Sequence, residues 1–424
     1  MAINPRNPLF LLIASLVALS LVNIQRLHTW HFQETIVHES RKGSPALKFF
    51  ILDAPQYTSR LIQNDSEMSS SYYREALNEE SAEIWLHRGF DRMTYEDGHT
   101  LDPNETDVFL ITGYAHLHES GFYKKPINAS VYESLIVDPT KPHLLLMPTW
   151  NPSRSTHTGI KNLATALQSQ NVSLWSVGFE RNSAWQGVPT PRIIPIPYVV
   201  RQEKSPQEIL PRTSNFVFFA GDPRRAAKKW GGCDREKMLT PLMNEIDMFL
   251  KVLKGKGNRL NQTTYNRYMR TSDYCLMLCG DTPTSRGLAS AMVSGCIPIR
   301  VGSRLRGLCE PPCVQGWGWS VTGAEYPHLP YNHRIPWDEF PEIDEGNFTE
   351  NGREVLNEVF QKYDNGQKEK MRKIMDEVRE GWIYGWGDPV TSANFGNAYD
   401  FILDSFVSAL RKENVTLPRQ VLEV

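Results

Sequence analysis

The residues best suited to bind a ligand are concentrated in the segment Tyr274–Val301. This segment begins and ends in apolar runs, with a short polar loop between them. The loop is a glycine that permits a sharp turn, followed by turn-forming residues: Gly280, Asp281, Thr282 and Thr284. Ser285 is a natural N-cap residue, so the sequence predicts a helix that begins directly after it and ends at Gly295.

A loop that joins the carboxyl end of a parallel strand to a helix N-terminus is where open α/β sheets bind ligands. The backbone amides of residues 280–285 and the helix dipole favour an anion, and Arg286 adds a positive charge in the first turn. A diphosphate fits this arrangement. Strand–glycine–helix junctions that bind nothing are also common, so a purely structural role stays open. Because a cation in the first turn opposes the helix dipole, Arg286 favours the ligand-binding interpretation.

The elements that would position this segment follow from the hydrophobic pattern. Five short apolar runs in the first half predict buried strands, at 48–52, 107–111, 143–147, 173–177 and 192–196. Segments long enough for helices lie between them, at 70–86 and 160–168. Alternation of buried strands and helices predicts a parallel α/β layer structure.

A second series follows the polar, proline-containing linker 200–212. Strands are predicted at 216–220, 274–278 and 296–301, a helix at 239–253, and loops from 302 to about 348. Helical periodicity returns near 355–360 and 371–378, and a last amphipathic helix carries Tyr399, Ile402, Phe406 and Leu410 on one face. The sequence therefore predicts two α/β halves and a terminal helical segment.

The composition of the chain excludes or disfavours several classes of protein. The chain has 424 residues, with 46 Lys and Arg against 48 Asp and Glu, so its net charge is −2. Near-neutral charge argues against a protein that binds nucleic acid through many phosphate contacts, and it disfavours a strongly anionic polysaccharide acceptor. A mean hydropathy of −0.42 excludes a polytopic membrane protein, although it allows one span.

One such span is predicted near the N-terminus, where 17 residues from Pro8 to Ile24 carry no charge. No small-residue cleavage pattern follows Val22, so a signal-anchor is favoured over a cleaved signal peptide or a buried helix. The expected layout is a cytosolic tail at 1–8, an anchor at 9–24, a stem at 25–45 and a lumenal body.

Two further patterns suit a lumenal body. Seven Asn-x-Ser/Thr sequons predict a glycoprotein, at Asn64, Asn104, Asn128, Asn171, Asn261, Asn347 and Asn414. All six cysteines lie between residues 233 and 313, and Cys309 and Cys313 bracket a constrained loop that suits a local disulfide. The chain has no Cys-x-x-Cys pair, so a zinc site is disfavoured.

The stretch GDTPTSRGLASAMVSGCIPI at 280–299 resembles the signature of the exostosin family, glycosyltransferase family 47. The likeness extends in order along the chain. Lys48–Pro55 (KFFILDAP) resembles the family's opening strand, and Thr100–Ile111 (TLDPNETDVFLI) is similar to its next conserved element. Phe216–Gly221 resembles its FFAG strand, and Ile335–Phe348 its proline-aromatic segment.

The resemblance implies a GT-B fold, in which two Rossmann-like domains face a cleft behind a single N-terminal transmembrane helix. The N-terminal, acceptor-side domain would span 46–205, the nucleotide-sugar-binding domain 206–385, and a C-terminal helical segment 386–424. It also implies inverting transfer to a glycan or glycoprotein hydroxyl by a type II, single-pass Golgi membrane protein. No metal or other cofactor would be required, no nucleic acid would be bound, and a homo- or heterodimer with a related transferase is possible.

Site residues carry over position by position. Arg286 and the amides of 280–285 would stabilise the leaving diphosphate. Gly221 and the cationic pair Arg224 and Arg225 would approach the donor from a neighbouring loop, although the pair also fits a solvated turn. Glu325 is a candidate from its own position and not from the resemblance: it lies in the loop after Trp319, where a contact to a donor hydroxyl could come from, and it also suits a structural role. Cys275 and Cys296 occupy positions where the family also has cysteines, as buried thiols or as bridge partners.

The chain departs from the family at several of these positions. Gly287 replaces the second arginine of the family's usual pair, and Ser290 stands where family members often have an acidic residue, so the resemblance does not carry over a carboxylate contact to the donor ribose. Residues 148–151 (PTWN) stand where the family has a His-Asp pair. The catalytic base is therefore assigned only to candidates near strand ends, each of which also suits a structural role: Asp53, His116 and His118.

These departures keep a second hypothesis open, that of a catalytically inactive GT-B protein that binds glycans or assists an active transferase. A secreted oxidoreductase dependent on NAD(P) is a third. It is disfavoured because no Gly-x-Gly-x-x-Gly follows a predicted strand.

Overall fold

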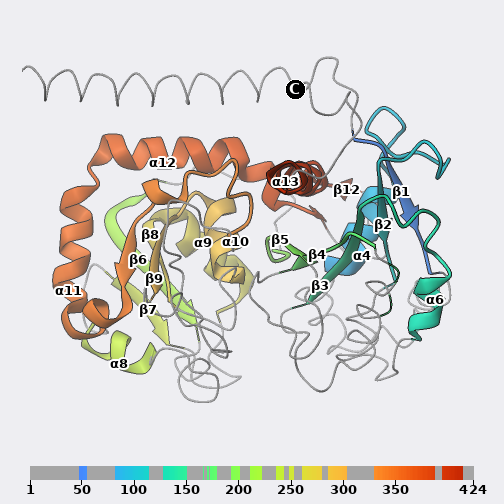
Figure 1. Cartoon of the computed structure of the whole chain (residues 1–424). Coiled ribbons are helices and arrows are strands. Elements are labelled where there is room, and N and C mark those ends of the chain that lie inside the picture. The colour runs from blue at the N-terminus through green and yellow to red at the C-terminus, as the bar shows by residue number, and fades with distance from the viewer. Residues whose placement is uncertain are drawn as a thin grey trace, which may run out of the picture.

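A computed structural model describes two α/β halves joined by a C-terminal helix (Figure 1). The residues that it describes are 47–54, 82–113, 128–149, 166, 170, 172–178, 192–200, 211–221, 235–242, 248–252, 260–278, 285–302, 329–386 and 394–413. Structural statements below concern these residues. The predicted anchor at 9–24 lies outside them, and none of the helices within them is both long and apolar enough to cross a membrane.

The first half contains a five-stranded parallel sheet whose strands lie in chain order. Its strands are β1 (Phe49–Leu52), β2 (Val108–Ile111), β3 (His143–Thr149), β4 (Leu174–Gly178) and β5 (Arg192–Pro195). All five occupy the predicted apolar runs, because a parallel strand covered on both faces must be apolar along its length. β1 forms the edge far from the second half and β5 the edge beside it (Figure 1).

Two helices of the first half are described. α4 (Ala82–Asp91) lies within and just beyond the predicted helix 70–86, and it buries Trp85, Leu86 and Phe90 against the core. The short α6 (Ala129–Glu133) is capped by Asn128, whose side-chain oxygen accepts a hydrogen bond from the Ser130 amide.

The second half contains another five-stranded parallel sheet, in the order β10-β9-β8-β6-β7. The strands are β6 (Thr213–Gly221), β7 (Met248–Val252), β8 (Ser272–Met277), β9 (Ile297–Gly302) and β10 (Glu342–Asp344). The predicted helix at 239–253 is wrong: after α8 (Arg235–Leu239) and the 3-10 turn Thr240–Leu242, the chain forms strand β7. Phe249 and Leu250 pair with β6, so sheet pairing overrides the local pattern.

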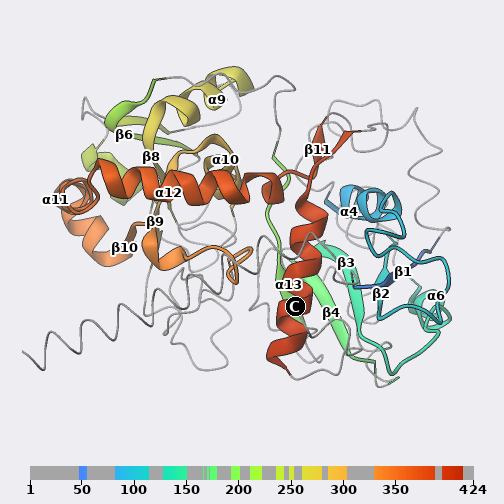
Figure 2. The same cartoon turned by 90° about the horizontal axis from the view of Figure 1, so that it is seen from above.

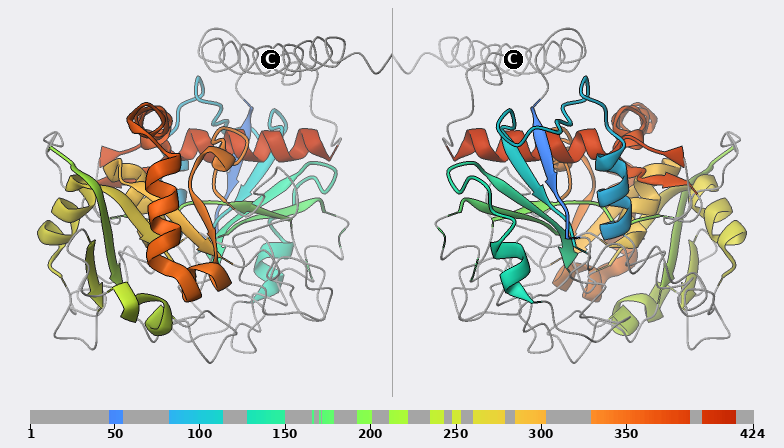
Figure 3. Two further views of the ribbon diagram at one scale, coloured as in Figure 1. Left: turned by 90° about the vertical axis from the view of Figure 1, so that its left-hand side faces the viewer. Right: turned by 90° about the vertical axis from the view of Figure 1, so that its right-hand side faces the viewer.

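Helices cover this second sheet on both sides. They are α9 (Gln262–Thr271), α10 (Arg286–Ser294), α11 (Glu345–Lys362) and α12 (Asn365–Val378). The last two confirm the predicted helical periodicity. Figure 3 shows α11 along the outer edge of the second sheet in the left panel and the first sheet from its β1 side in the right panel.

The chain then returns to the first half. After a 3-10 turn at Arg379–Trp382 and the hairpin of β11 (Gly385–Trp386) and β12 (Asn394–Phe395), α13 (Ala398–Lys412) lies beside the first sheet (Figure 2). Its Phe406 ring packs 5.6 Å from Trp175 of β4, and Tyr399 packs 5.4 Å from Phe90 of α4. The last element of the sequence thus completes the core of the first half.

A buried ionic cluster fixes α12 to the second sheet. The Asp273 carboxylate of β8 accepts hydrogen bonds from Lys368 Nζ at 3.0 Å and Arg372 Nη2 at 2.6 Å. These two cations lie one turn apart on α12, so they meet one carboxylate from the same helix face. Asp273 and Lys368 are nearly inaccessible to solvent.

A disulfide joins Cys275 of β8 to Cys296, directly before β9, with Cα atoms 5.7 Å apart. This pairing confirms the bridge-partner alternative for the two cysteines. The predicted Cys309–Cys313 bridge lies outside the described residues. Because the disulfide closes the loop that contains α10, it restricts the unfolded chain around the predicted donor segment.

Removal of this disulfide is expected to lower the free energy of unfolding by about 3 kcal/mol, since it closes a loop of 21 residues. Urea unfolding of the Cys275→Ala/Cys296→Ala variant against the wild type measures the loss. Added reductant should destabilise the wild type more than the variant, which keeps the predicted Cys309–Cys313 bridge. Equal stability of the oxidised wild type and the variant would contradict the prediction.

His143 is a fully buried histidine at the start of β3. Its Nδ1 donates to the Lys141 carbonyl at 2.8 Å, and its ring stacks 4.9 Å from that of Phe109. Burial lowers the pKa of His143 to about 4, against a partial opposing effect of the Lys141 hydrogen bond and the Asp138 charge. The folded protein therefore holds this ring in its neutral form.

Acidification from pH 7 to pH 4.5 is accordingly expected to destabilise the protein through His143 by about 2 kcal/mol. Between pH 6.5 and pH 4 the unfolded state binds the proton that the folded state excludes, so stability falls as pH falls. Urea unfolding at both pH values checks this, with His143→Gln as the comparison. Because His333, whose pKa burial lowers to about 3, is present in both proteins, their difference isolates His143. An identical pH dependence would refute the assignment.

Candidate donor site

The order of the second sheet creates a switch point between β6 and β8. From β6 the chain continues to β7 on one side, whereas from β8 it continues to β9 on the other. Val217 pairs with Tyr274 and Phe218 with Cys275, so the two strands end at the same edge. Oppositely directed connections leave a crevice outside such carboxyl ends, where open α/β sheets bind ligands. Gly221, the last residue of β6, lies at this edge.

α10 begins beside this crevice with the capping that the sequence predicts. The Ser285 hydroxyl accepts a hydrogen bond from the Leu288 amide at 3.2 Å, and Gly295 ends the helix with a φ of 70°. Arg286 is the first helical residue, and its side chain is exposed. A positive dipole end and an arginine therefore occupy one helix terminus, a combination that favours an anion and costs the isolated helix stability.

Tyr265 of α9 lies close to this terminus, which sequence inspection does not reveal. Burial raises the pKa of Tyr265, while the positive charge of Arg286 and a hydrogen bond with Ser290 oppose the rise. The Ser290 hydroxyl forms a hydrogen bond with this phenol from the neighbouring helix, so a polar, uncharged pair lies near the start of α10.

Gly287, which replaces the family's second arginine, is not enforced by crowding. A Cβ built there would lie 3.5 Å from Met277 Sδ and 3.5 Å from Ser285 Oγ, which is ordinary contact. The backbone at this position therefore accepts a side chain. Steric crowding does not explain why this chain has glycine where the family resemblance leads us to expect an arginine.

Asp53, a candidate base, follows β1 at the carboxyl end of the first sheet. Its Oδ1 accepts a hydrogen bond from Thr112 Oγ1 at 2.8 Å and lies 3.9 Å from His87 Nε2 of α4. Burial lowers the pKa of His87, against the opposing charges of Asp53 and Asp91. β1 is the strand farthest from the second sheet, so Asp53 lies across the first sheet from the β6–β8 crevice (Figure 1).

The sequence could have predicted Thr112 as a neighbour of Asp53. Thr112 follows β2 as Asp53 follows β1, and neighbouring parallel strands end at the same edge of a sheet. His87 carries no such signal, since its position depends on how α4 packs.

The remaining predicted site residues lie outside the described part of the chain. They are His116, His118, Arg224, Arg225, Gly280, Asp281, Thr282, Thr284 and Glu325. Among the residues that are described, no three His, Cys, Asp or Glu side chains group as metal ligands would.

Comparison with known proteins identifies the family. A family model described as the Exostosin GT47 domain matches residues 43–353, which cover both sheets. The chain belongs to this exostosin GT47 family, as the motif at 280–299 predicts.

Two plant proteins from Arabidopsis thaliana are among its relatives. The chain is 33% identical over 92 residues to a probable arabinosyltransferase, ARAD1, covering 22% of this chain and 20% of the relative. It is 24% identical over 226 residues to a probable xyloglucan galactosyltransferase, GT17, covering 47% of this chain and 48% of the relative. The chain thus spans about half the length, or less, of these curated relatives.

Proposed function

We propose that the protein is an inverting glycosyltransferase of GT-B type that uses a nucleotide sugar as donor. The observation that carries the proposal is the β6–β8 switch point with the Ser285-capped start of α10 and exposed Arg286 beside it. Membership of the exostosin GT47 family and two relatives named as probable sugar transferases support it.

In the proposed reaction, the acceptor hydroxyl oxygen attacks the anomeric carbon of the donor. The new C–O bond forms as the bond to the diphosphate breaks, the electron pair leaves on the diphosphate oxygen, and a base takes the hydroxyl proton. Arg286 and the amides at the start of α10 would stabilise the negative charge that develops on the leaving group. Gly221, Arg224, Arg225 and Glu325 remain proposed donor contacts.

We assign the body of the protein to the Golgi lumen, behind a single-pass anchor at 9–24, with a glycan or glycoprotein hydroxyl as acceptor. The apolar N-terminal run and the sequons support this location. Asp53 remains a proposed base, as do His116 and His118. The position of β1 at the far edge of the first sheet makes Asp53 the most distant of the strand ends from the proposed donor.

A screen of the full-length protein in detergent against a panel of nucleotide sugars tests the activity, with hydrolysis and transfer measured with and without chelator. Turnover that Arg286→Ala lowers by about 10²- to 10³-fold would support the enzyme. Absence of both binding and turnover with every donor would refute it and favour the inactive-partner hypothesis. That hypothesis draws on Gly287, Ser290 and the PTWN stretch at 148–151, which depart from what the family resemblance leads us to expect.

A further inference from the structure

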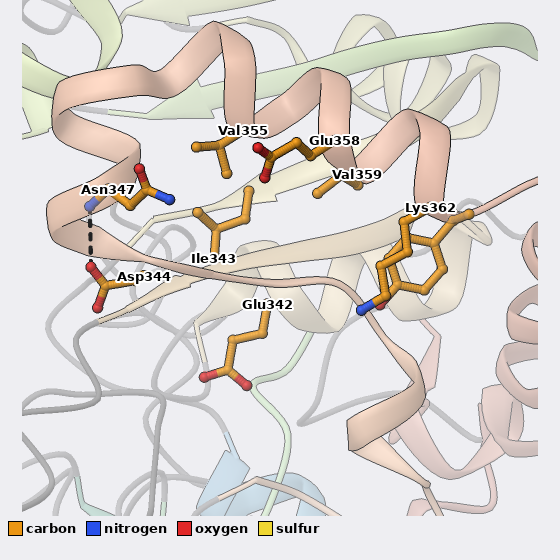
Figure 4. Close-up of a pocket in the computed structure, with 9 residues that line it drawn as sticks. Glu342, Ile343, Asp344, Asn347, Val355, Glu358, Val359 and Lys362 are labelled. Carbon is orange, nitrogen blue, oxygen red and sulfur yellow. Dashed lines mark hydrogen bonds between the residues drawn. The ribbon is translucent and has the colours of Figure 1, made fainter. Parts of the chain in front are cut away.

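A cavity of about 210 Å³ lies between edge strand β10 and helix α11, on the outer side of the second sheet (Figure 4). Ile343, Val355 and Val359 line it with side chains that are almost fully buried, whereas Glu358 and Lys362 are exposed, and most of the accessible lining is polar. It has no role in the proposed reaction, because two strands separate β10 from the β6–β8 crevice.

Asn347 lines this cavity from the first turn of α11, and its side chain is exposed. Its backbone amide donates to Asp344 Oδ1 at 3.1 Å, and its side-chain oxygen accepts from Asn351 Nδ2 at 3.0 Å. This second contact orients the amide group. Figure 4 shows the side-chain nitrogen of Asn347 directed toward Val355 and Glu358, into the cavity.

That nitrogen belongs to the sequon Asn347-Phe348-Thr349, and it is the atom that N-glycosylation modifies. A sugar ring presents an apolar C–H face and a rim of hydroxyls. The cavity matches chiefly the hydroxyls, since carboxylate, ammonium and amide groups provide most of its accessible lining and the buried valine and isoleucine side chains the smaller, apolar part. Its volume of about 210 Å³ is many times the roughly 10–15 Å³ that a single water needs, so the space admits a group larger than water.

We propose that Asn347 carries an N-linked glycan whose first N-acetylglucosamine residue occupies this cavity. The proposal rests on the lumenal location given under Proposed function. The co-reactant is a lipid-linked oligosaccharyl diphosphate. A bond forms between Asn347 Nδ2 and the anomeric carbon as the C–O bond to the diphosphate breaks, and the amide proton passes to the oligosaccharide transferase.

A sugar in this position would protect the edge of the sheet. β10 is the last strand of the described sheet, so one side of it lacks a partner strand there. Unpaired strand edges invite pairing with other chains, and proteins cover them in many ways. A glycan anchored one turn into α11 would cover this edge with a hydrated, bulky group.

Site occupancy is tested on the full-length protein from a eukaryotic host, by amidase deglycosylation in heavy-oxygen water and peptide mass spectrometry. Asn347 should be labelled in the wild type and in Thr349→Ser, which keeps the sequon, but not in Thr349→Ala. An unmodified Asn347 beside modified Asn104, Asn128 or Asn261 overturns the proposal and leaves the lumenal location intact. No modification at any sequon overturns both.

Occupancy of the cavity has its own test. Protein trimmed by an endoglycosidase that leaves the first sugar is compared with protein made in cells whose N-glycosylation is inhibited, in which Asn347 stays an amide, and hydrogen exchange is followed across 342–363. Absence of the first sugar should speed exchange there about fivefold. Equal rates would overturn the seating of the sugar. The matched control is Asn261, an exposed N-cap whose oxygen accepts from Thr264 N at 2.8 Å; the same comparison should leave exchange in α9 unchanged.

Discussion

Replacement of Arg286 by alanine is expected to lower kcat/KM for the nucleotide-sugar donor by about 10²- to 10³-fold. The reason is electrostatic: the variant removes the cation at the start of α10, where the leaving diphosphate gains negative charge. Arg286→Lys keeps the charge but loses the planar two-pronged geometry that matches a phosphate, so we expect an intermediate loss of about tenfold. Steady-state kinetics with the donor found in the nucleotide-sugar screen measure both effects.

A stability measurement distinguishes donor binding by Arg286 from a structural role of the same residue. Because Arg286 opposes the dipole of α10, the alanine variant should unfold at the same urea concentration as the wild type or slightly higher. Arg267→Ala, which removes another exposed arginine from the adjacent α9, should leave kcat/KM unchanged. If Arg286→Ala stayed within threefold of wild-type kcat/KM, the donor site would not lie at this helix terminus.

Asp273→Ala is expected to lower the free energy of unfolding by about 3–5 kcal/mol. The variant leaves two cations of α12, Lys368 and Arg372, without the carboxylate that both contact. Uncompensated charge in a buried position is far costlier than the loss of an exposed ion pair. Urea unfolding followed by circular dichroism gives the value.

Glu369→Ala provides the matched control. Glu369 contacts the same Arg372 at 2.7 Å, but its carboxylate is 72% exposed, so its removal should cost less than about 1 kcal/mol. Similar losses for Asp273→Ala and Glu369→Ala would show that burial does not set the energy of this cluster. A double variant, Asp273→Ala/Lys368→Met, should recover part of the loss because it removes one of the two buried charges.

Much of the fold follows from local apolar runs, because strands buried on both faces leave a continuous hydrophobic signature. The five strands of the first sheet lie where those runs predict them. The sequence around β7 predicts a helix instead, since the three-residue apolar run Met248–Leu250 within a longer amphipathic stretch fits either structure. β10 was missed because its sequence, Glu-Ile-Asp, has one apolar residue; its position comes from pairing with β9.

In the candidate site, too, features set by neighbouring residues could be predicted, and features set by packing between distant elements could not. Ser285 and Gly295 perform the capping roles that their residue types predict, since capping depends on a few neighbouring backbone groups. Tyr265 was not predictable because it reaches Arg286 and Ser290 from another helix. The pairing of Cys275 with Cys296 was one of two alternatives until the sheet brought the two residues together.

The return of α13 to the first half has a consequence for biosynthesis. Trp175 and Phe90 each gain an aromatic neighbour from residues 398–412, which leave the ribosome after every strand of both sheets. The first half therefore emerges early with an uncovered apolar face and cannot complete its core until synthesis is nearly finished. During that interval the nascent chain exposes a surface that chaperones bind and that drives aggregation.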